Sequence, residues 1–158
     1  MKEKDFLDLI NRHKGILHKI CYSYSNTQEE YEDLMQEVLL QLWRSKERFK
    51  GQSSYSTWMY KVALFTALAH VKRKKPYVVS EIEDYQQKAE SSNELTDELE
   101  VLNLAIKSLP EADRAVLILY LEEKSYREMS EILGLTESNI GVKLNRIKEK
   151  LRKLMISR

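Results

Sequence analysis

The chain has 158 residues, of which 42% are hydrophobic and 32% are charged. This balance excludes a disordered chain, and a membrane span is not expected because no apolar run approaches the roughly 18 residues that one needs. Cys21 is the only cysteine, so no internal disulfide or thiolate zinc site is expected and a reducing cytoplasm fits. The net charge of +1 conceals an uneven distribution, because residues 1–75, 76–100, 101–123 and 124–158 carry +5, −7, −2 and +5. Two basic regions around an acidic one indicate contact with a polyanion at both ends of the chain.

Apolar residues recur at spacings of three and four along most of the chain, and only four glycines and two prolines interrupt them. This period predicts an all-α protein. Three helices are expected in the first half, over residues 4–24, 27–45 and 56–74. Thr27 followed by Glu30 indicates a capping box at the start of the second helix. Pro76 ends the third helix, because the residue before a proline disfavours the helical conformation.

Residues 76–93 have no sustained period and are strongly acidic, which predicts a flexible linker. The expected organisation is therefore an N-terminal domain over residues 1–75, a linker over 76–93 and a C-terminal domain over 94–158. Helices resume over residues 94–108. Pro110 is expected at the first position of a buried helix that includes Ala115, Ile118 and Leu121.

The last part of the chain predicts a helix-turn-helix. Met129, Ile132 and Leu133 form the buried side of a short helix, Gly134 takes the left-handed conformation after it, and Thr136 caps the next helix. The buried side of that next helix is expected to hold Leu135, Ile140, Leu144, Ile147, Leu151 and Leu154. Ser130 is interpreted as a small residue at a close helix crossing, and Gly141 as a point where the backbone approaches DNA.

Such a pair of helices places the second one in the major groove of duplex DNA. Side chains near the start of that helix reach base edges, and the later cations lie where phosphates would be. The candidate duplex contacts are Thr136, Ser138, Asn139, Lys143, Arg146 and Lys150. An ordinary helical hairpin with a basic surface is the alternative.

The second expected helix carries an apolar residue in the middle of its polar face. Leu40 lies there, and Trp43 lies on the margin of the same face. An apolar spot rimmed by polar residues often marks a protein partner. A single exposed leucine is also common in proteins without a partner.

The run from Asp33 to Trp43 (DLMQEVLLQLW) resembles the segment of sigma factors that grips the clamp helices of the largest subunit of RNA polymerase. The runs 48–51, 55–63 and 72–74 resemble the sigma region that opens and reads the −10 element, and the part from Leu109 onward resembles the −35-reading domain. Order, spacing and size match the compact extracytoplasmic-function (ECF) group of the sigma-70 family. The resemblance implies an all-α protein in which a region 2-like helical bundle and a region 4-like helix-turn-helix are joined by the acidic linker.

The resemblance also assigns residues. It implies that Asp33, Gln36, Glu37, Leu40 and Trp43 bind polymerase. It implies −10 contacts by Lys50, Ser53, Ser54, Tyr55, Thr57, Trp58, Lys61, Lys72, Arg73 and Lys74. Aromatic faces and cations of this kind hold bases that strand opening has taken out of the stack. Tyr60 is expected to add a third ring, whereas Trp58 suits a core position equally well.

Two positions depart from the pattern of the family. Leu64-Phe65 stand where relatives often carry Arg-Asn, so the −10 base preference cannot be transferred. Gly141-Val142 replace the basic and hydroxyl residues often found in the recognition helix, which leaves Asn139, Lys143 and Arg146 as the expected readers.

The implied partners are core RNA polymerase and promoter DNA, in the cytoplasm and without a membrane. Many members of the family are held inactive by an anti-sigma factor, which is a further candidate partner, and such an inhibitor is expected to cover the spot around Leu40 and the basic helices. An enzyme is not expected, since His13, His18 and His70 are scattered and no catalytic or metal-binding spacing occurs; no cofactor or metal is expected either. A stand-alone helix-turn-helix regulator with an N-terminal interaction domain is the alternative, and such a regulator would bind duplex DNA without polymerase.

Overall fold

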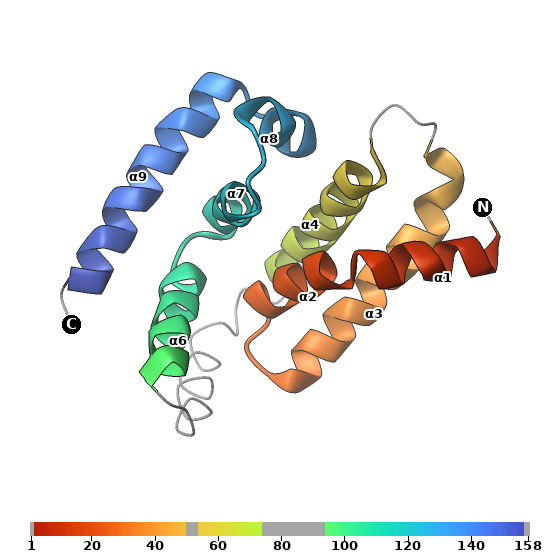
Figure 1. Cartoon of the computed structure of the whole chain (residues 1–158), viewed down its shortest axis with the longest axis horizontal. Coiled ribbons are helices and arrows are strands. Elements are labelled where there is room, and N and C mark those ends of the chain that lie inside the picture. The colour runs from red at the N-terminus through yellow and green to blue at the C-terminus, as the bar shows by residue number, and fades with distance from the viewer. Residues whose placement is uncertain (1, 50–53, 74–93, 157–158) are drawn as a thin grey trace. The chain divides into compact units, whose positions relative to one another are not determined.

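The computed structural model of the chain describes residues 2–49, 54–73 and 94–156, and within those ranges every regular element is a helix (Figure 1). The predicted all-α class is therefore confirmed. The chain divides into two compact units, Met1–Arg73 and Lys74–Arg158. The predicted linker, residues 76–93, lies outside the described residues, and the predicted domain boundaries stay a prediction. In the described part of the chain, no helix is both long and apolar enough to cross a membrane.

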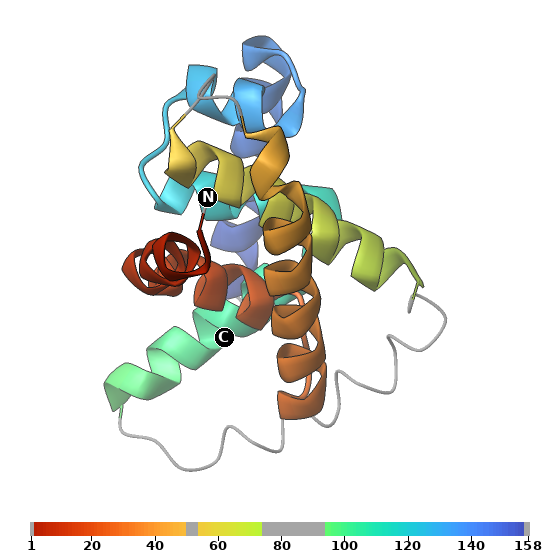
Figure 2. The same cartoon turned by 90° about the vertical axis from the view of Figure 1, so that its right-hand side faces the viewer.

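In its described residues, 2–49 and 54–73, unit 1 is built of α-helices and a short 3₁₀ turn. Its elements are α1 (Glu3–Arg12), α2 (Lys14–Ser23), α3 (Gln28–Ser45), η1 (Lys46–Arg48) and α4 (Tyr55–Arg73). The prediction of one helix over residues 4–24 is wrong, because the helix is interrupted at His13, where φ is −114° and ψ is 23°. Gly15 follows two residues later, and the low helix propensity of glycine makes a continuous helix less stable at this point. Figure 2 shows α1 nearly end-on and α3 along its length, so these two helices cross.

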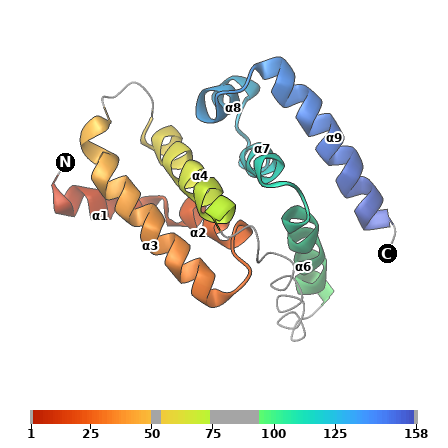
Figure 3. The ribbon, with the colours of Figure 1, turned by 180° about the vertical axis from the view of Figure 1, so that it is seen from behind.

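The core of unit 1 forms where α4 packs against α2 and α3, as Figure 3 shows from behind. Leu17 of α2, Leu34 of α3 and Met59 of α4 are completely buried there. Cys21 is also completely buried, and its burial raises the pKa of the thiol to about 12. The thiol therefore stays protonated and unreactive at neutral pH.

The start of α3 is capped nearly as predicted. The Thr27 hydroxyl accepts a hydrogen bond of 3.1 Å from the backbone N–H of Glu30. The Glu30 carboxylate accepts from the N–H of Asn26 at 2.8 Å, one residue earlier than in a capping box. Both bonds satisfy backbone donors that the helix itself leaves without a partner.

Unit 2 contains α6 (Glu94–Lys107), α7 (Glu111–Leu121), α8 (Tyr126–Leu133) and α9 (Glu137–Ile156). The α6, α7 and α8 helices each pack against α9. Pro110 is the residue before α7 and not its first residue, since its ψ of 150° is not helical. Leu121 and Leu154 were expected to be buried but are 53% and 38% exposed, because they lie at the last residue of α7 and near the end of α9, where fewer neighbours cover a side chain.

A tight turn joins α7 to α8. The N–H of Lys124 donates to the carbonyl of Leu119 (3.1 Å) and that of Glu123 to the carbonyl of Tyr120 (3.0 Å), which is a Schellman motif. Glu123 has a positive φ of 62°, at the position where glycine is usual. The turn thus satisfies the last carbonyls of α7 and aims the chain into α8.

Candidate polymerase and nucleic-acid interfaces

The outer face of α3 carries the predicted apolar spot. Leu40 is 44% exposed and Trp43 is 37% exposed. Gln36, one turn before Leu40, and Arg44, one turn after it, are also exposed, as is Asp33. Leu40 therefore lies in a polar surface, whereas Val38 and Leu42 of the same helix are completely buried.

Trp43 also makes contacts within unit 1. Its ring packs edge-on against Phe6 of α1, with ring centroids 5.1 Å apart, and the ammonium group of Lys46 lies 3.6 Å from its centroid. Trp43 therefore helps to hold α1 on α3. Leu40 is the cleaner probe of this surface, because its exposed side chain can be changed without disturbing that contact.

Glu37 joins α3 to the end of α4. Its carboxylate accepts a 2.7 Å hydrogen bond from the Arg73 guanidinium and lies 3.3 Å from Nδ1 of His70. Partial burial raises the pKa of Glu37, but the hydrogen bonds and charges of Arg73 and His70 outweigh it and leave the pKa below its ordinary value. The structure thus pairs a predicted polymerase contact, Glu37, with a predicted DNA contact, Arg73.

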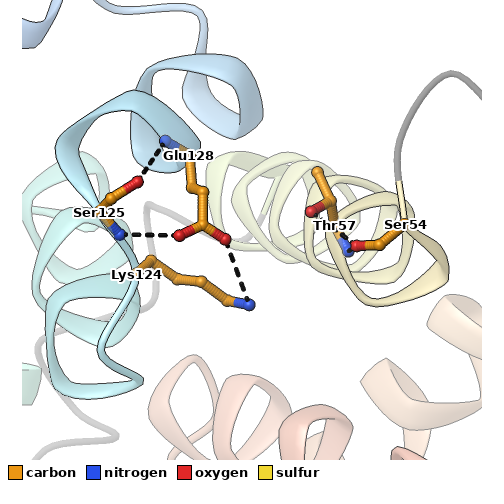
Figure 4. Close-up of polar contacts among 5 residues, drawn as sticks. All are labelled: Ser54, Thr57, Lys124, Ser125 and Glu128. Carbon is orange, nitrogen blue, oxygen red and sulfur yellow. Dashed lines mark hydrogen bonds and ion pairs between the residues drawn. The ribbon is translucent and has the colours of Figure 1, made fainter.

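The start of α4 is an aromatic cluster held by a helix cap. The Ser54 hydroxyl accepts from the N–H of Thr57 at 3.1 Å (Figure 4). Tyr55 stacks on Phe49 with centroids 4.5 Å apart, and Trp58 lies 5.5 Å from Phe49. Phe49 was assigned no role from the sequence. The one feature that could have indicated it is its position as an aromatic residue just before the loop that precedes Tyr55. Tyr55 is 42% exposed, whereas Trp58 is 9% exposed.

The other predicted −10 residues divide into four groups. Lys61 and Lys72 are exposed on α4, and Arg73 is held by Glu37. Tyr60, expected as a third ring for DNA, is 1% exposed; it belongs to the core because it lies on the side of α4 that faces the bundle. Lys50, Ser53 and Lys74 lie outside the described residues.

The helix-turn-helix of unit 2 is built by local hydrogen bonds. Ser125 and Glu128 form a complete capping box at the start of α8 (Figure 4), and the hydrogen bond from the backbone N–H of Ser125 holds the pKa of Glu128 below its usual value. Gly134 takes the predicted left-handed conformation, with φ of 72°. The Ser130 hydroxyl donates to the carbonyl of Leu135 at 2.5 Å and so stabilises the turn. The sequence prediction explained Ser130 by its small size at a helix crossing and missed this hydrogen bond.

The α9 helix begins at its predicted cap, since the Thr136 hydroxyl accepts from the N–H of Asn139 at 3.1 Å. Its exposed side carries the predicted polar and basic residues Ser138, Asn139, Arg146 and Lys150. Lys143 differs, because its ammonium group lies 3.6 Å from the carboxylate of Asp113 on α7.

Gly141 was interpreted as a point where the backbone approaches DNA. A Cβ atom built at this position would meet the Tyr126 ring of α8 at 3.5 Å. Gly141 therefore faces α8 and not the outer side of α9.

Unit 1 carries aromatic and basic residues on α4. Unit 2 contains a capped helix-turn-helix with a basic outer helix. Together these features are those of a DNA-binding protein built from two helical units. Residues 9–77 match the family model Sigma-70 region 2, and residues 99–151 match Sigma-70, region 4. The chain belongs to the extracytoplasmic-function group of the sigma-70 family. It is thus a transcription initiation factor and not an enzyme.

Curated relatives agree with this family, and solved structures share the fold. The chain is 27% identical to the ECF RNA polymerase sigma factor SigW of Bacillus subtilis strain 168, over 94% of this chain and 87% of that one. It is 26% identical to the RNA polymerase sigma factor YlaC of the same strain, over 98% and 95%. The fold resembles that of the sigma factor RpoE of Bartonella quintana, solved with the anti-sigma factor NepR, with a TM-score of 0.73, 20% identity and coverage of 96% and 97%. CnrH, solved with the cytosolic domain of CnrY, gives a TM-score of 0.71 at 18% identity, with coverage of 99% and 90%.

Proposed function

We propose that this chain works in the cytoplasm, where it binds core RNA polymerase through the outer face of α3 and directs it to promoters. Unit 1 holds the polymerase and the opened −10 element, and unit 2 reads the −35 element as duplex DNA. The family supports the promoter-directing role. The assignment of surfaces depends above all on one observation, the exposure of Leu40 within the polar face of α3.

An exposed leucine at this place favours a protein partner. Leu40 gains nothing from water, and the polar groups of Gln36 and Asp33 on the same face can form the rim of an interface around it. Apolar anchors with a polar rim are the usual anatomy of a protein–protein contact. DNA would select cations at these positions instead.

The DNA-binding surfaces follow from charge and exposure. Arg146 and Lys150 are exposed on the outer side of α9, where they can reach phosphates, while Asn139 near the start of the helix can reach a base edge. In unit 1, the exposed lysines of α4 and the stacked Tyr55 supply the charge and the aromatic surface that unpaired bases need.

The experiment is a binding titration of core RNA polymerase with the Leu40→Asp variant. A charge placed in the centre of an interface weakens binding, and we expect a loss of about tenfold or more. Leu7→Asp is the matched control, because Leu7 is a 53% exposed leucine on α1 of the same unit. Circular dichroism checks that both variants fold. Equal affinities of Leu40→Asp and the wild type would refute the assignment of this surface.

A second measurement separates the sigma factor from the stand-alone regulator. The purified chain is tested for redirecting core polymerase in run-off transcription on genomic DNA, followed by mapping of the start sites. A sigma factor produces new start sites and binds duplex DNA weakly by itself. Tight duplex binding without polymerase, together with no new start sites, would favour the regulator.

A protein inhibitor of this chain is expected to cover the spot around Leu40, because the same apolar anchor would serve any protein that competes with polymerase. RpoE and CnrH were each solved with a bound partner protein. For an inhibitor found by co-purification, the check is competition with core polymerase for the wild-type chain. Undiminished binding of the inhibitor to the Leu40→Asp variant would place it elsewhere.

A further inference from the structure

The outer side of α4 carries a stripe that combines two lysines predicted to contact the −10 element with two residues to which the sequence prediction gave no contact. Its members are Lys61, Phe65, Ala69 and Lys72, and all four are exposed. The spacings of four, four and three residues place them on one face of the helix. Phe65 is 46% exposed, whereas the neighbouring Leu64 is completely buried, so the Leu64-Phe65 pair divides between the core and the surface.

Phe65 supplies an exposed aromatic ring, which most of the other rings of α4 do not. Trp58 and Tyr60 are 9% and 1% exposed and belong to the core. Tyr55 is exposed, but one face of its ring is stacked on Phe49. In the described part of α4, Phe65 and Tyr55 are therefore the aromatic rings that a nucleic acid can reach.

We propose that Phe65 stacks on an unpaired base of the opened promoter, while Lys61 and Lys72 contact phosphates on either side of that base. This inference depends on the proposed function, since it concerns the DNA strand that unit 1 holds. The small Ala69 next to Phe65 on the stripe leaves space beside the ring for a base. The two lysines make the occupant a polyanion and not an apolar protein segment.

The dimensions of the stripe fit a short single strand. Lys61 and Lys72 are 11 residues apart, which at about 1.5 Å per residue is roughly 16 Å along the helix axis. A stacked strand rises about 3.4 Å per nucleotide, so the stripe spans about five nucleotides. Phe65 lies one turn after Lys61 and can meet a base between the phosphates that the lysines contact.

The test uses the holoenzyme formed from core polymerase and the full chain, on a promoter found by start-site mapping. Binding is measured on the duplex promoter at low temperature and on the same promoter with a mismatched bubble over the −10 element. We expect Phe65→Ala to lower the affinity for the bubble template about 5- to 150-fold, the effect of losing one stacked base, and to leave duplex binding within twofold. Phe65→Tyr keeps a ring and should stay within threefold of the wild type.

Phe65→Leu distinguishes stacking from simple apolar contact. Leucine keeps apolar surface without an aromatic face, so this variant should behave like Phe65→Ala. Wild-type affinity of Phe65→Leu, or an unchanged bubble affinity of Phe65→Ala, would overturn the inference. Binding of core polymerase is measured for each variant and should not change, because a loss there would mean that Phe65 contacts protein.

The lysines provide an independent readout in the salt dependence of bubble binding. Lys61→Ala and Lys72→Ala should each reduce the slope of log affinity against log salt by about 0.7, the value for one phosphate of a single strand. An unchanged slope in both variants would overturn the phosphate contacts. A wild-type holoenzyme that binds no promoter would instead refute the proposed function, so the two failures can be told apart.

Discussion

The two helices assigned to DNA, α4 and α9, are nearly equal in length but differ in how much of each is buried. In α4, seven of 19 residues are buried, including Met59 and Ala63, whereas in α9 three of 20 are buried. The α4 helix is central to unit 1, and its exposed stripe is narrow and contains an aromatic ring. The α9 helix leaves a broad outer side, which is polar and basic around Asn139 and Arg146.

The difference suits two forms of DNA. A broad basic side can lie in the major groove of a duplex, where base edges and phosphates are contacted together. A narrow stripe with a ring between cations suits a single strand, whose bases present their faces. Burial thus separates the two proposed tasks: most of α4 is committed to the core of unit 1 and leaves a narrow stripe for DNA, whereas most of the surface of α9 is available for DNA.

The largest expected effect tests the structural half of this comparison. Met59→Ala in α4 should cost about 2–5 kcal/mol of the free energy of unfolding, because it leaves a cavity in the centre of unit 1. Val142→Ala in α9 should change it by less than about 0.5 kcal/mol, since Val142 is 56% exposed. Denaturant unfolding followed by circular dichroism measures both. Similar costs for the two variants would contradict the different burial of the helices.

The next effect concerns the contacts of α9 with duplex DNA. Arg146→Ala should weaken binding of the holoenzyme to a −35 element by about 1–3 kcal/mol, because we propose that its exposed guanidinium contacts DNA directly. Lys143→Ala should cost less, because Asp113 already pairs with that ammonium group in the free protein. Titration of a labelled promoter at fixed salt compares the variants.

Asp113→Asn provides the matched control for that experiment. Removal of the carboxylate frees Lys143 for phosphate, so DNA affinity should rise and the salt slope should steepen by about 0.9, the value for one phosphate of duplex DNA. Unchanged affinity and slope would show that Asp113 and a DNA phosphate do not compete for the ammonium group of Lys143.

Much of the fold follows from local patterns in the sequence. The predicted ends of α3 and α8 depend on capping residues such as Thr27 and Gly134, and such residues act within a few positions of themselves. The break at His13 was missed because the apolar period of residues 4–24 continues through it. Whether a helix bends at one residue depends on the surface it must cover, and that surface is made by distant parts of the chain.

The candidate sites show the same limit. Helical periodicity correctly placed Leu40 on a polar surface, because exposure on a regular helix follows from spacing. The pairs Glu37–Arg73 and Asp113–Lys143 join residues that are about 30 or more positions apart, and no local pattern reports them. For the same reason Tyr60 was assigned to DNA by its residue type, although the packing of α4 puts it in the core.

A smaller effect is expected at the contact between α8 and α9. Gly141→Ala should raise the free energy of unfolding by about 0.5–1 kcal/mol, because alanine favours a helix interior over glycine by this amount. The new methyl group meets the Tyr126 ring at an ordinary contact distance of 3.5 Å. Thermal unfolding of unit 2, followed by circular dichroism, measures the change. A loss of stability would mean that the ring cannot accommodate the methyl group.

The smallest effect lies in the Glu37 network and depends on pH. Because the pKa of Glu37 is lower in the folded protein than in the unfolded chain, its contribution is complete above the unfolded pKa of about 4.3 and disappears as the pH falls through the folded value. Glu37→Gln should therefore cost about 0.2–1 kcal/mol at pH 6 and less at pH 3. Trp43 and Trp58 are the only tryptophans of the chain and both lie in unit 1, so their fluorescence during denaturant unfolding at the two pH values measures this unit. Arg73→Ala removes the principal hydrogen-bond donor to Glu37 and should make the stability depend less on pH over the same range. Equal costs of Glu37→Gln at both pH values would mean that the carboxylate charge does not stabilise the junction of α3 and α4.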